Sequence, residues 1–202
     1  FWVIVVMVPG ALLIGVLAGM REGSRADRVL STLAIVGTST PEYVAGVVLT
    51  VIFASKMFGL QWLSGSATTA AETGPTFYNF TLPVLTIAIF GMGYIARMTR
   101  AAMAEVMTQQ YIRTARLKGL SFHAVVIRHA LRNALIPIIT SAGSYLPYVF
   151  LGSLVFESFF GIPGLGAYVI EAISKQDFAI VRTMVFVGSV LAIASYILID
   201  IA

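Results

Sequence analysis

Five apolar stretches, each close to the length of a transmembrane helix, most constrain what this chain can fold into. An α-helix needs about 20 mostly apolar residues to cross the hydrocarbon core of a bilayer. The stretches run from Trp2 to Met20, from Val29 to about Ala54, roughly from Thr81 to Met98, from Ala134 to Val155, and from Thr183 to the end. Only 11% of the residues are charged, against about a quarter in soluble domains. We predict an all-α, polytopic transmembrane helix bundle of about five spans.

The bundle is predicted to form one transmembrane domain over residues 1–202. The chain opens on Phe1 and stops inside an apolar run at Ala202. We therefore expect an N-terminal helix and a C-terminal tail to lie beyond this sequence. The sequence contains no Cys, which excludes a disulfide framework, a thiolate metal site and a thiol nucleophile within it.

Basic residues gather in two of the segments that connect the spans. They are Arg21, Arg25 and Arg28 in the first, and Arg97, Arg100 and the run from Arg113 to Arg132 in the second. Because positive loops stay in the cytoplasm, both segments are predicted to be cytoplasmic. For the first segment we favour the interpretation that its charge only sets the topology.

The second segment, residues 99–133, is far longer than the usual connection between bundle helices, which has about two to eight residues. Neither Pro nor Gly occurs from Ala104 to Lys118, so we predict a helix there. Gly119 can then end this helix in the left-handed conformation. Ser121 can cap a second helix that runs into the fourth span. The expected arrangement is helix, turn, helix.

One face of the first of these helices suits contact with another protein. Ile112, Ala115, Arg116 and Gly119 recur at helical spacing, so small residues lie beside a basic one. Such a face allows close approach, and its basic groups could meet acidic groups of a partner or anionic lipid. The alternative is that Ala115 packs inside the chain and Gly119 is only a cap.

The segment also resembles the cytoplasmic signature of permease subunits in binding-protein-dependent ABC importers: E-A-A, three residues, G, nine residues, I-x-L-P. Only Ala115, Gly119 and Leu131 match that general form. RTARLKGL followed by RHALRNALIP is, however, similar to the first permease subunit of the dipeptide, oligopeptide and nickel branch. The resemblance continues in GVLAGMREGSRADR, ARMTRAAMAEVM and VFESFFGIPGLGAYVIEAI.

The resemblance implies a prokaryotic plasma membrane, the inner membrane in a Gram-negative cell. It also implies a second homologous permease subunit, two cytoplasmic ATPase subunits and an extracytoplasmic substrate-binding protein. The loop would be the coupling helix, with its ATPase contacts at Arg113, Thr114, Ala115, Arg116, Lys118 and Gly119. The sequence has no G-x-x-x-x-G-K-[ST] loop, so ATP and Mg²⁺ are expected on the partner ATPases and this chain is expected to hold no cofactor.

Two carboxylates fall within or beside predicted spans. Glu42 lies near the middle of the second span, and Pro41 beside it interrupts the helical hydrogen bonds. A charge at that depth is costly, so Glu42 either faces the translocation path, where it attracts a substrate ammonium or gates the opening, or is protonated or paired for packing. Glu157, at the outer end of the fourth span, is either a solvated interfacial carboxylate or part of an outer gate.

The sequence supports other functions less strongly than it supports an ABC importer permease. An ion-coupled secondary transporter or channel would use Glu42 as its titrating group. No nucleophilic triad or metal cluster is visible, since His123 and His129 are six residues apart and off one helical face. We expect no catalytic residue and no nucleic-acid partner. Residues 56–80 and a surface helix after GIPGLG are candidates for contact with the binding protein. The substrate is left open among dipeptides, oligopeptides, nickel and oligosaccharides.

Overall fold

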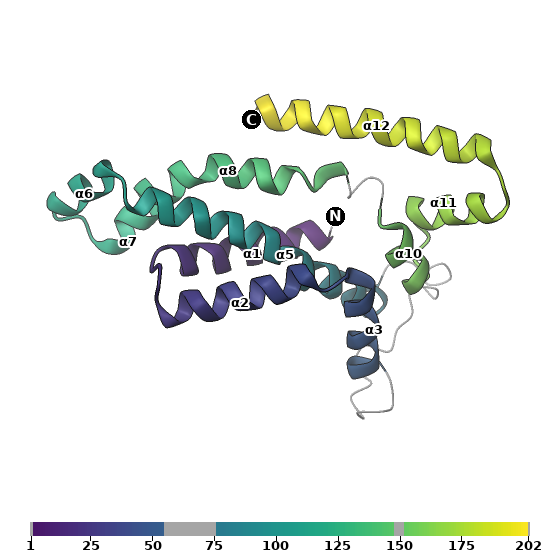
Figure 1. Ribbon diagram of the computed structural model, residues 1–202, viewed down its shortest axis with the longest axis horizontal. Helices are drawn as coiled ribbons and strands as arrows, with labels where there is room; N and C mark the ends of the chain where they lie inside the picture. Colours follow the sequence, from purple (N-terminus) through teal and green to yellow (C-terminus); the bar gives the residue numbers. More distant parts are fainter. Residues whose placement is uncertain (1, 55–75, 148–151, 202) are drawn as a thin grey trace. The chain divides into compact units, whose positions relative to one another are not determined.

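The computed structural model describes residues 2–54, 76–147 and 152–201, and every regular element in these ranges is a helix (Figure 1). The helices are α1 (Trp2–Gly19), α2 (Arg25–Ser39), α3 (Glu42–Phe53), α5 (Phe77–Met107), α6 (Gln110–Leu117), α7 (Phe122–Ala124), η3 (Val125–Leu131), α8 (Arg132–Gly143), α10 (Leu154–Phe160), α11 (Leu165–Ser174) and α12 (Phe178–Ile201). The η3 segment is a π-helix. The all-α prediction is confirmed.

Between four and six segments of the described chain are long and apolar enough to cross a membrane. Four are continuous: Trp2–Gly19, Asn79–Met107, Phe122–Gly143 and Phe178–Ile201. Two more result if the broken pairs α2 with α3 and α10 with α11 each count as one span. Only 11% of the α12 span is buried within the chain. An apolar helix so exposed is typical of one whose surface meets lipid or another membrane subunit.

The second predicted span consists of two helices. Pro41 has an extended backbone, with φ −58° and ψ 135°, and separates Ser39 at the end of α2 from Glu42 at the start of α3. A proline disfavours helical geometry in the residue before it, which explains the break. The interruption at Pro41 is confirmed, but Glu42 lies in the first turn of a helix and not in the middle of a continuous one.

The fourth predicted span has different limits. The helical run starts at Phe122, and α8 ends at Gly143. Val155, the predicted end, belongs to α10. The predicted span began at Ala134 because the apolar run begins there, but the helix that Ser121 was predicted to cap continues through it without a break. Arg128 and Arg132 lie on the exposed side of that helix. The helix that contains the third predicted span is longer than that span, since α5 runs from Phe77 to Met107.

The chain divides into two compact units. One contains residues 4–39 and 88–142, and the other contains residues 40–87 and 143–202 with the first three residues. We call the first the loop unit, because it includes α6 and α7, and the second the turn unit. Most of residues 56–80, predicted to contact a binding protein, lie outside the described residues.

Small residues let the helices of the loop unit approach closely. A Cβ built on Gly15 would lie 2.6 Å from the carbonyl oxygen of Ala96, and one on Gly19 would lie 2.6 Å from Cβ of Met103. Both contacts join α1 to α5. Since lipid is as apolar as the side chains, membrane helices associate through such close packing more than through hydrophobic burial.

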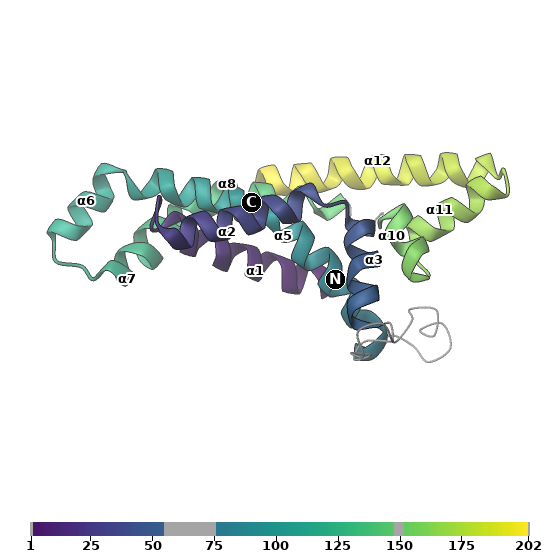
Figure 2. The same cartoon turned by 60° about the horizontal axis from the view of Figure 1, so that its bottom comes forward.

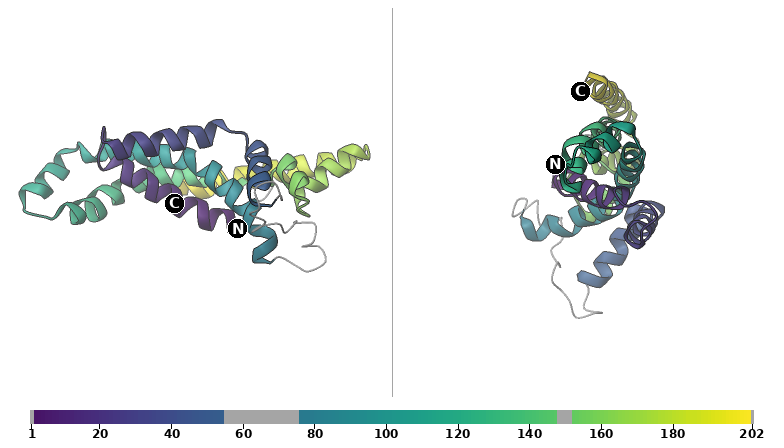
Figure 3. Two further views of the ribbon diagram at one scale, coloured as in Figure 1. Left: turned by 90° about the horizontal axis from the view of Figure 1, so that it is seen from below. Right: turned by 90° about the vertical axis from the view of Figure 1, so that its left-hand side faces the viewer.

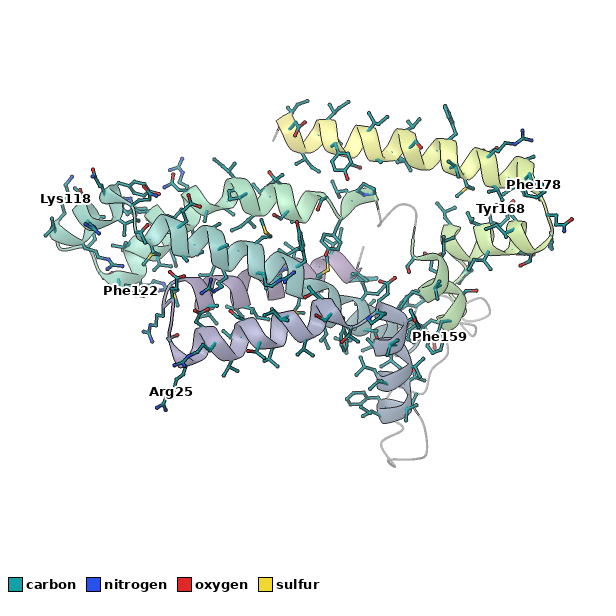
Figure 4. The ribbon with its side chains drawn as sticks, viewed as in Figure 1. Arg25, Lys118, Phe122, Phe159, Tyr168 and Phe178 are labelled. Carbon is teal, nitrogen blue, oxygen red and sulfur yellow. The ribbon has the colours of Figure 1, made fainter. Side chains whose placement is uncertain are left out.

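Two sharp turns organise the turn unit. The axes of α10 and α11 differ by 93°, and Gly161 between them has a φ of 63°. The chain then reverses between α11 and α12, where Gln176 has a φ of 57° and the N–H of Asp177 donates to the carbonyl of Ala172 at 2.9 Å. Figure 4 labels Phe178 where α12 begins after this reversal. The predicted helix after GIPGLG is α11, so that element is confirmed.

Candidate coupling site

The predicted helix, turn, helix element forms one end of the loop unit. Helices α6 and α7 project beyond the ends of α1 and α2 in Figures 1 and 2 and in the left view of Figure 3. The element begins where α5 stops at Met107 and returns through η3 into α8. It therefore connects α5 to α8 through a segment that extends beyond the other helices of the loop unit.

The first predicted loop helix is broken near its start. We expected one helix from Ala104 to Lys118, but α5 ends at Met107 and α6 begins at Gln110. The hydroxyl of Thr108 donates to the carbonyl of Glu105 at 2.7 Å, and the backbone of Gln109 is extended, with ψ 149°. A threonine side chain that bonds the backbone locally competes with helix propagation. The break gives α6 its own direction.

The turn after α6 has the predicted chemistry. Gly119 has a φ of 78°, its N–H donates to the carbonyl of Arg116 at 3.0 Å, and the N–H of Leu120 donates to the carbonyl of Ala115 at 3.4 Å. This pair of bonds is the Schellman motif that ends many helices. The hydroxyl of Ser121 then accepts from the N–H of Ala124 at 3.3 Å. Both predicted caps are confirmed.

The inner face of α6 is buried in its own unit. Ile112 is fully buried and Ala115 is 5% exposed, in a core with Met103 of α5 and with Val126 and Ala130 of η3. The predicted face of Ile112, Ala115, Arg116 and Gly119 is thus divided between core and surface. For Ala115 the packing alternative is supported, because its methyl group is enclosed by residues of this chain.

The outer face of α6 carries the remaining predicted contacts. Arg113, Thr114, Arg116, Lys118 and Gly119 are all exposed. Leu117 lies among them and is 88% exposed, more than any other large apolar side chain of the described residues. The sequence reasoning did not identify it. The available signal was a leucine between two basic residues on the side opposite Ile112 and Ala115.

The turn is braced by an aromatic contact. The guanidinium carbon of Arg116 lies 5.8 Å from the ring centroid of Phe122, within the range of a cation–π interaction. Figure 4 labels Lys118 and Phe122 on the two sides of the turn. The contact joins the end of α6 to the start of α7, so the basic outer face is held in a defined position.

A π-helix links the turn to α8. The seven residues of η3 contribute Val125, Val126 and Ala130 to the core that encloses Ala115. A π-helix is less stable than an α-helix and often marks a functional position. The chain between the turn and α8 therefore includes a π-helical segment that packs directly against α6.

An ion pair fixes the helices next to the loop. Nε and Nη2 of Arg100 donate to the two carboxylate oxygens of Asp27 at 2.7 and 2.8 Å. Asp27 is 3% exposed and also accepts from the N–H of Gly23 at 2.8 Å and from the hydroxyl of Ser31 at 3.1 Å. This bidentate pair attaches α2 to α5. Sequence reasoning gave Arg100 only a topological role and did not single out Asp27.

The structure gives specific partners to the two predicted carboxylates of the turn unit. Glu42 is exposed in the first turn of α3 and accepts a hydrogen bond from the hydroxyl of Ser153. Glu157 is half-buried, and its Oε2 accepts from the N–H of Ala167 in the first turn of α11 at 3.1 Å. Glu157 thus caps a neighbouring helix, which neither the solvated nor the gating interpretation anticipated.

Comparison with known proteins gives one family. The family described as the inner membrane component of binding-protein-dependent transport systems matches residues 11–202. The dipeptide transport system permease protein of Bacillus subtilis is 37% identical over 201 residues, which is 98% of this chain and 62% of the relative. The oligopeptide transport system permease protein of Haemophilus influenzae is 35% identical over 187 residues, 93% of this chain and 59% of the relative. The chain thus spans less than two thirds of the length of these relatives.

A solved structure has a similar fold. It is described as an amino acid ABC transporter with histidines, and it superposes with a TM-score of 0.64 over 98% of this chain and 86% of its own. The sequences are 18% identical, so the likeness concerns the fold alone.

Proposed function

Because this chain belongs to the family of binding-protein-dependent transport system inner membrane components, we propose that it is a permease subunit of an ATP-driven importer. The cargo is a peptide or a similar small solute, which the names of the dipeptide and oligopeptide permease relatives support. Such a subunit changes no bond in its cargo, so it is a transport subunit and not an enzyme. The observation that carries the proposal is the exposed basic face of α6 with Leu117 at its centre.

The importer would contain a second homologous permease subunit, two cytoplasmic ATPase subunits and an extracytoplasmic binding protein, in a prokaryotic plasma membrane. Bacterial relatives and the family description as an inner membrane component support this assignment. ATP and Mg²⁺ would bind to the ATPases, because the phosphate-binding loop that holds them is missing from this sequence.

We propose that α6 docks on an ATPase through its outer face. Leu117 enters an apolar pocket of the partner, while Arg113, Arg116 and Lys118 meet acidic groups around it. Full burial of a leucine contributes about 1.5–3 kcal/mol, enough to anchor a small interface. Thr114 and Gly119 complete the contact surface. Ala115, although part of the family signature, acts here by packing α6 on its own core.

The core behind α6 provides a mechanical connection. Ile112 and Ala115 of α6 pack with Met103 of α5 and with Ala130 and Ala134 ahead of the membrane part of α8. Tightly packed cores transmit displacements and compress little. A movement of the ATPase would therefore be passed through α6 to both long helices at once. Alternating access would follow from their joint displacement.

For the translocation path we propose the break at Pro41 and Glu42. Broken membrane helices often line substrate sites, because their freed backbone groups need a cavity or a partner. The carboxylate of Glu42 would attract the ammonium group of a peptide, and Ser153 would orient it through its hydrogen bond. Glu157 would serve the outer end indirectly, by fixing α11 relative to α10.

Cysteine cross-linking tests the docking assignment directly. The sequence contains no Cys, so single cysteines at Leu117 and, as the control, at exposed Lys175 would report on one position each. In membranes that hold the full transporter, Leu117→Cys should cross-link to the ATPase and the yield should change with ATP. Lys175→Cys should give no product.

The opposite result would favour the competing function. If an assembled and active transporter gives no Leu117 cross-link, the docking assignment is wrong. Transport that follows an ion gradient without ATP, and stops in Glu42→Gln, would then identify an ion-coupled carrier.

A further inference from the structure

A basic cleft between α2 and α5 is not used by the proposed coupling mechanism. It belongs to the loop unit and has a volume of about 310 Å³. Its lining residues are Asp27, Arg28, Ser31, Ile35, Arg97 and Arg100. The volume is near the lower end of the range for small-ligand sites, about 300–1,000 Å³. A cleft of this volume can hold a headgroup-sized ligand.

The cleft carries excess positive charge. Asp27 is fully used, because Arg100 binds both its carboxylate oxygens and Gly23 and Ser31 donate to them as well. Arg28 and Arg97 are exposed, and neither makes an ion pair within the described parts of the chain. Two guanidinium groups are therefore free to bind an anion, on a scaffold that the Asp27 pair holds fixed.

The position along the helices corresponds to a membrane interface. With 31 residues, α5 is about 46 Å long, more than the roughly 30 Å of the hydrocarbon core. Arg97 lies in the second half of α5, ten residues before its end at Met107. Arg28 is in the first turn of α2, just after the chain re-enters from the connecting turn. Both arginines thus lie toward the helix ends that join the segments predicted to be cytoplasmic.

Apolar surface continues from the basic cleft toward the membrane interior. Ile35 lines the cleft and is 49% exposed, two turns further along α2 than Arg28. The adjoining crevice between α1, α2 and α5 has a volume of only about 10 Å³. A ligand thus cannot enter between the helices. It must rest on their outer surface, with an anion at the arginines and an apolar part along Ile35.

We propose that this cleft binds an anionic phospholipid of the cytoplasmic leaflet. Arg28 and Arg97 hold the phosphate by charge-assisted hydrogen bonds, and Ile35 contacts the start of an acyl chain. Arg100 and Asp27 hold the two helices together. Because they pair with each other, they do not bind the lipid phosphate. One part of this inference rests on the proposed function. The lipid is assigned to the cytoplasmic leaflet because the proposed function places α6 on the cytoplasmic side.

Native mass spectrometry of the purified transporter would test the lipid site. The probes are phosphatidylglycerol, phosphatidylcholine with the same acyl chains, and inorganic phosphate. Phosphatidylglycerol should bind preferentially, and the double variant Arg28→Gln with Arg97→Gln should weaken its binding about tenfold or more, as expected for the loss of two charge-assisted bonds. Replacing both arginines by lysine should retain part of the preference.

The matched control is the double variant Arg21→Gln with Arg25→Gln. It removes the same charge from exposed arginines outside the cleft. Figure 4 shows Arg25 pointing away from the helices. The affinity of this variant for the lipid should stay within about twofold of that of the unmodified protein. A twofold change corresponds to less than about 0.5 kcal/mol of binding free energy. An equal loss in both double variants would mean unspecific surface charge and would overturn the proposal.

Two further outcomes would also overturn it. Equal binding of phosphatidylcholine would remove the need for an anionic headgroup, and inorganic phosphate that binds as tightly as the lipid would identify a free anion as the ligand. The Leu117 cross-link distinguishes a failure of the lipid inference from a failure of the proposed function. If the lipid site fails while that cross-link persists, only the lipid inference is wrong.

Discussion

The turns after α6 and after α10 have the same backbone geometry, but the space around the first is open and the space around the second is filled. In each, a glycine with positive φ, Gly119 or Gly161, follows the helix, and the next N–H bonds back five residues. Around Gly119 an added Cβ would have no neighbour within 4 Å. The turn after α10 is instead filled by the carboxylate of Glu157, which lies close to Gly164 and Gly166.

This difference distinguishes the surface that we propose for a partner from a self-contained structural turn. The α10 turn satisfies its polar groups within the chain, since Glu157 caps α11 through the N–H of Ala167. The α6 turn leaves Leu117 in solvent, although an exposed leucine gains free energy by burial. Changes to the exposed side chains of the first turn should therefore affect transport without stability, and changes at the second turn should affect stability first.

The largest effect is expected for Leu117→Asp. A carboxylate would have to enter an apolar pocket and face acidic groups of the ATPase, so transport and substrate-stimulated ATP hydrolysis should fall about 100-fold, or about 2.7 kcal/mol. The melting temperature of the subunit should stay unchanged, because the side chain is 88% exposed. Leu117→Met is the control and should keep most activity. Normal transport by Leu117→Asp would show that the exposed turn is not the docking surface.

Gly166→Ala should be the most damaging change to the self-contained turn. The added Cβ would lie 2.8 Å from Oε2 of Glu157 and 3.0 Å from the backbone N and Cα of Leu154. Because a backbone cannot move aside as a side chain can, we expect about 2–3 kcal/mol of destabilisation, within the range of overpacked cores. Thermal unfolding in detergent measures it. A melting temperature equal to that of the unmodified protein would contradict the packing described for this turn.

A smaller loss is expected for Glu157→Ala. Removing the carboxylate leaves the N–H of Ala167 without its cap, which costs about 1–2 kcal/mol. Glu157→Gln keeps an acceptor oxygen and should restore at least half of the loss in the same unfolding measurement. If alanine and glutamine variants both unfold like the unmodified protein but fail in transport, Glu157 acts as a gate and the capping role is secondary.

Local sequence chemistry was sufficient to predict the exposed turn. Gly119 as a left-handed cap, Ser121 as an N-cap and Pro41 as a break each follow from the conformational preferences of one residue. The number of apolar stretches likewise gave the fold class, because the membrane sets the length of a spanning helix. These features depend on neighbours within a few residues, so the sequence shows them directly.

The remainder depends on contacts between distant residues. The pair of Asp27 and Arg100 joins positions 73 apart, and neither residue carries a local signal for it. Ala115 is buried because the chain turns at Thr108, before α6 begins, so that α6 packs on α5 and η3. A periodic face such as the one at Ala115 has the same pattern whether it meets a partner or its own core, so the sequence could not distinguish docking from packing.

The smallest effect is expected for Gly119→Ala, and it tests whether the open turn is limited by conformation alone. At a φ of 78° an alanine is strained by about 1 kcal/mol, because the conformation is unfavourable but no atom obstructs its Cβ. Gly119→Asn should cost less, because asparagine tolerates this conformation. Both variants should keep the Leu117 cross-link, and transport should fall only a few-fold. If Gly119→Asn unfolds like the unmodified subunit yet loses the cross-link, the partner approaches the glycine too closely for any side chain, and the contact of Gly119 with the ATPase is then more important than its role as a cap.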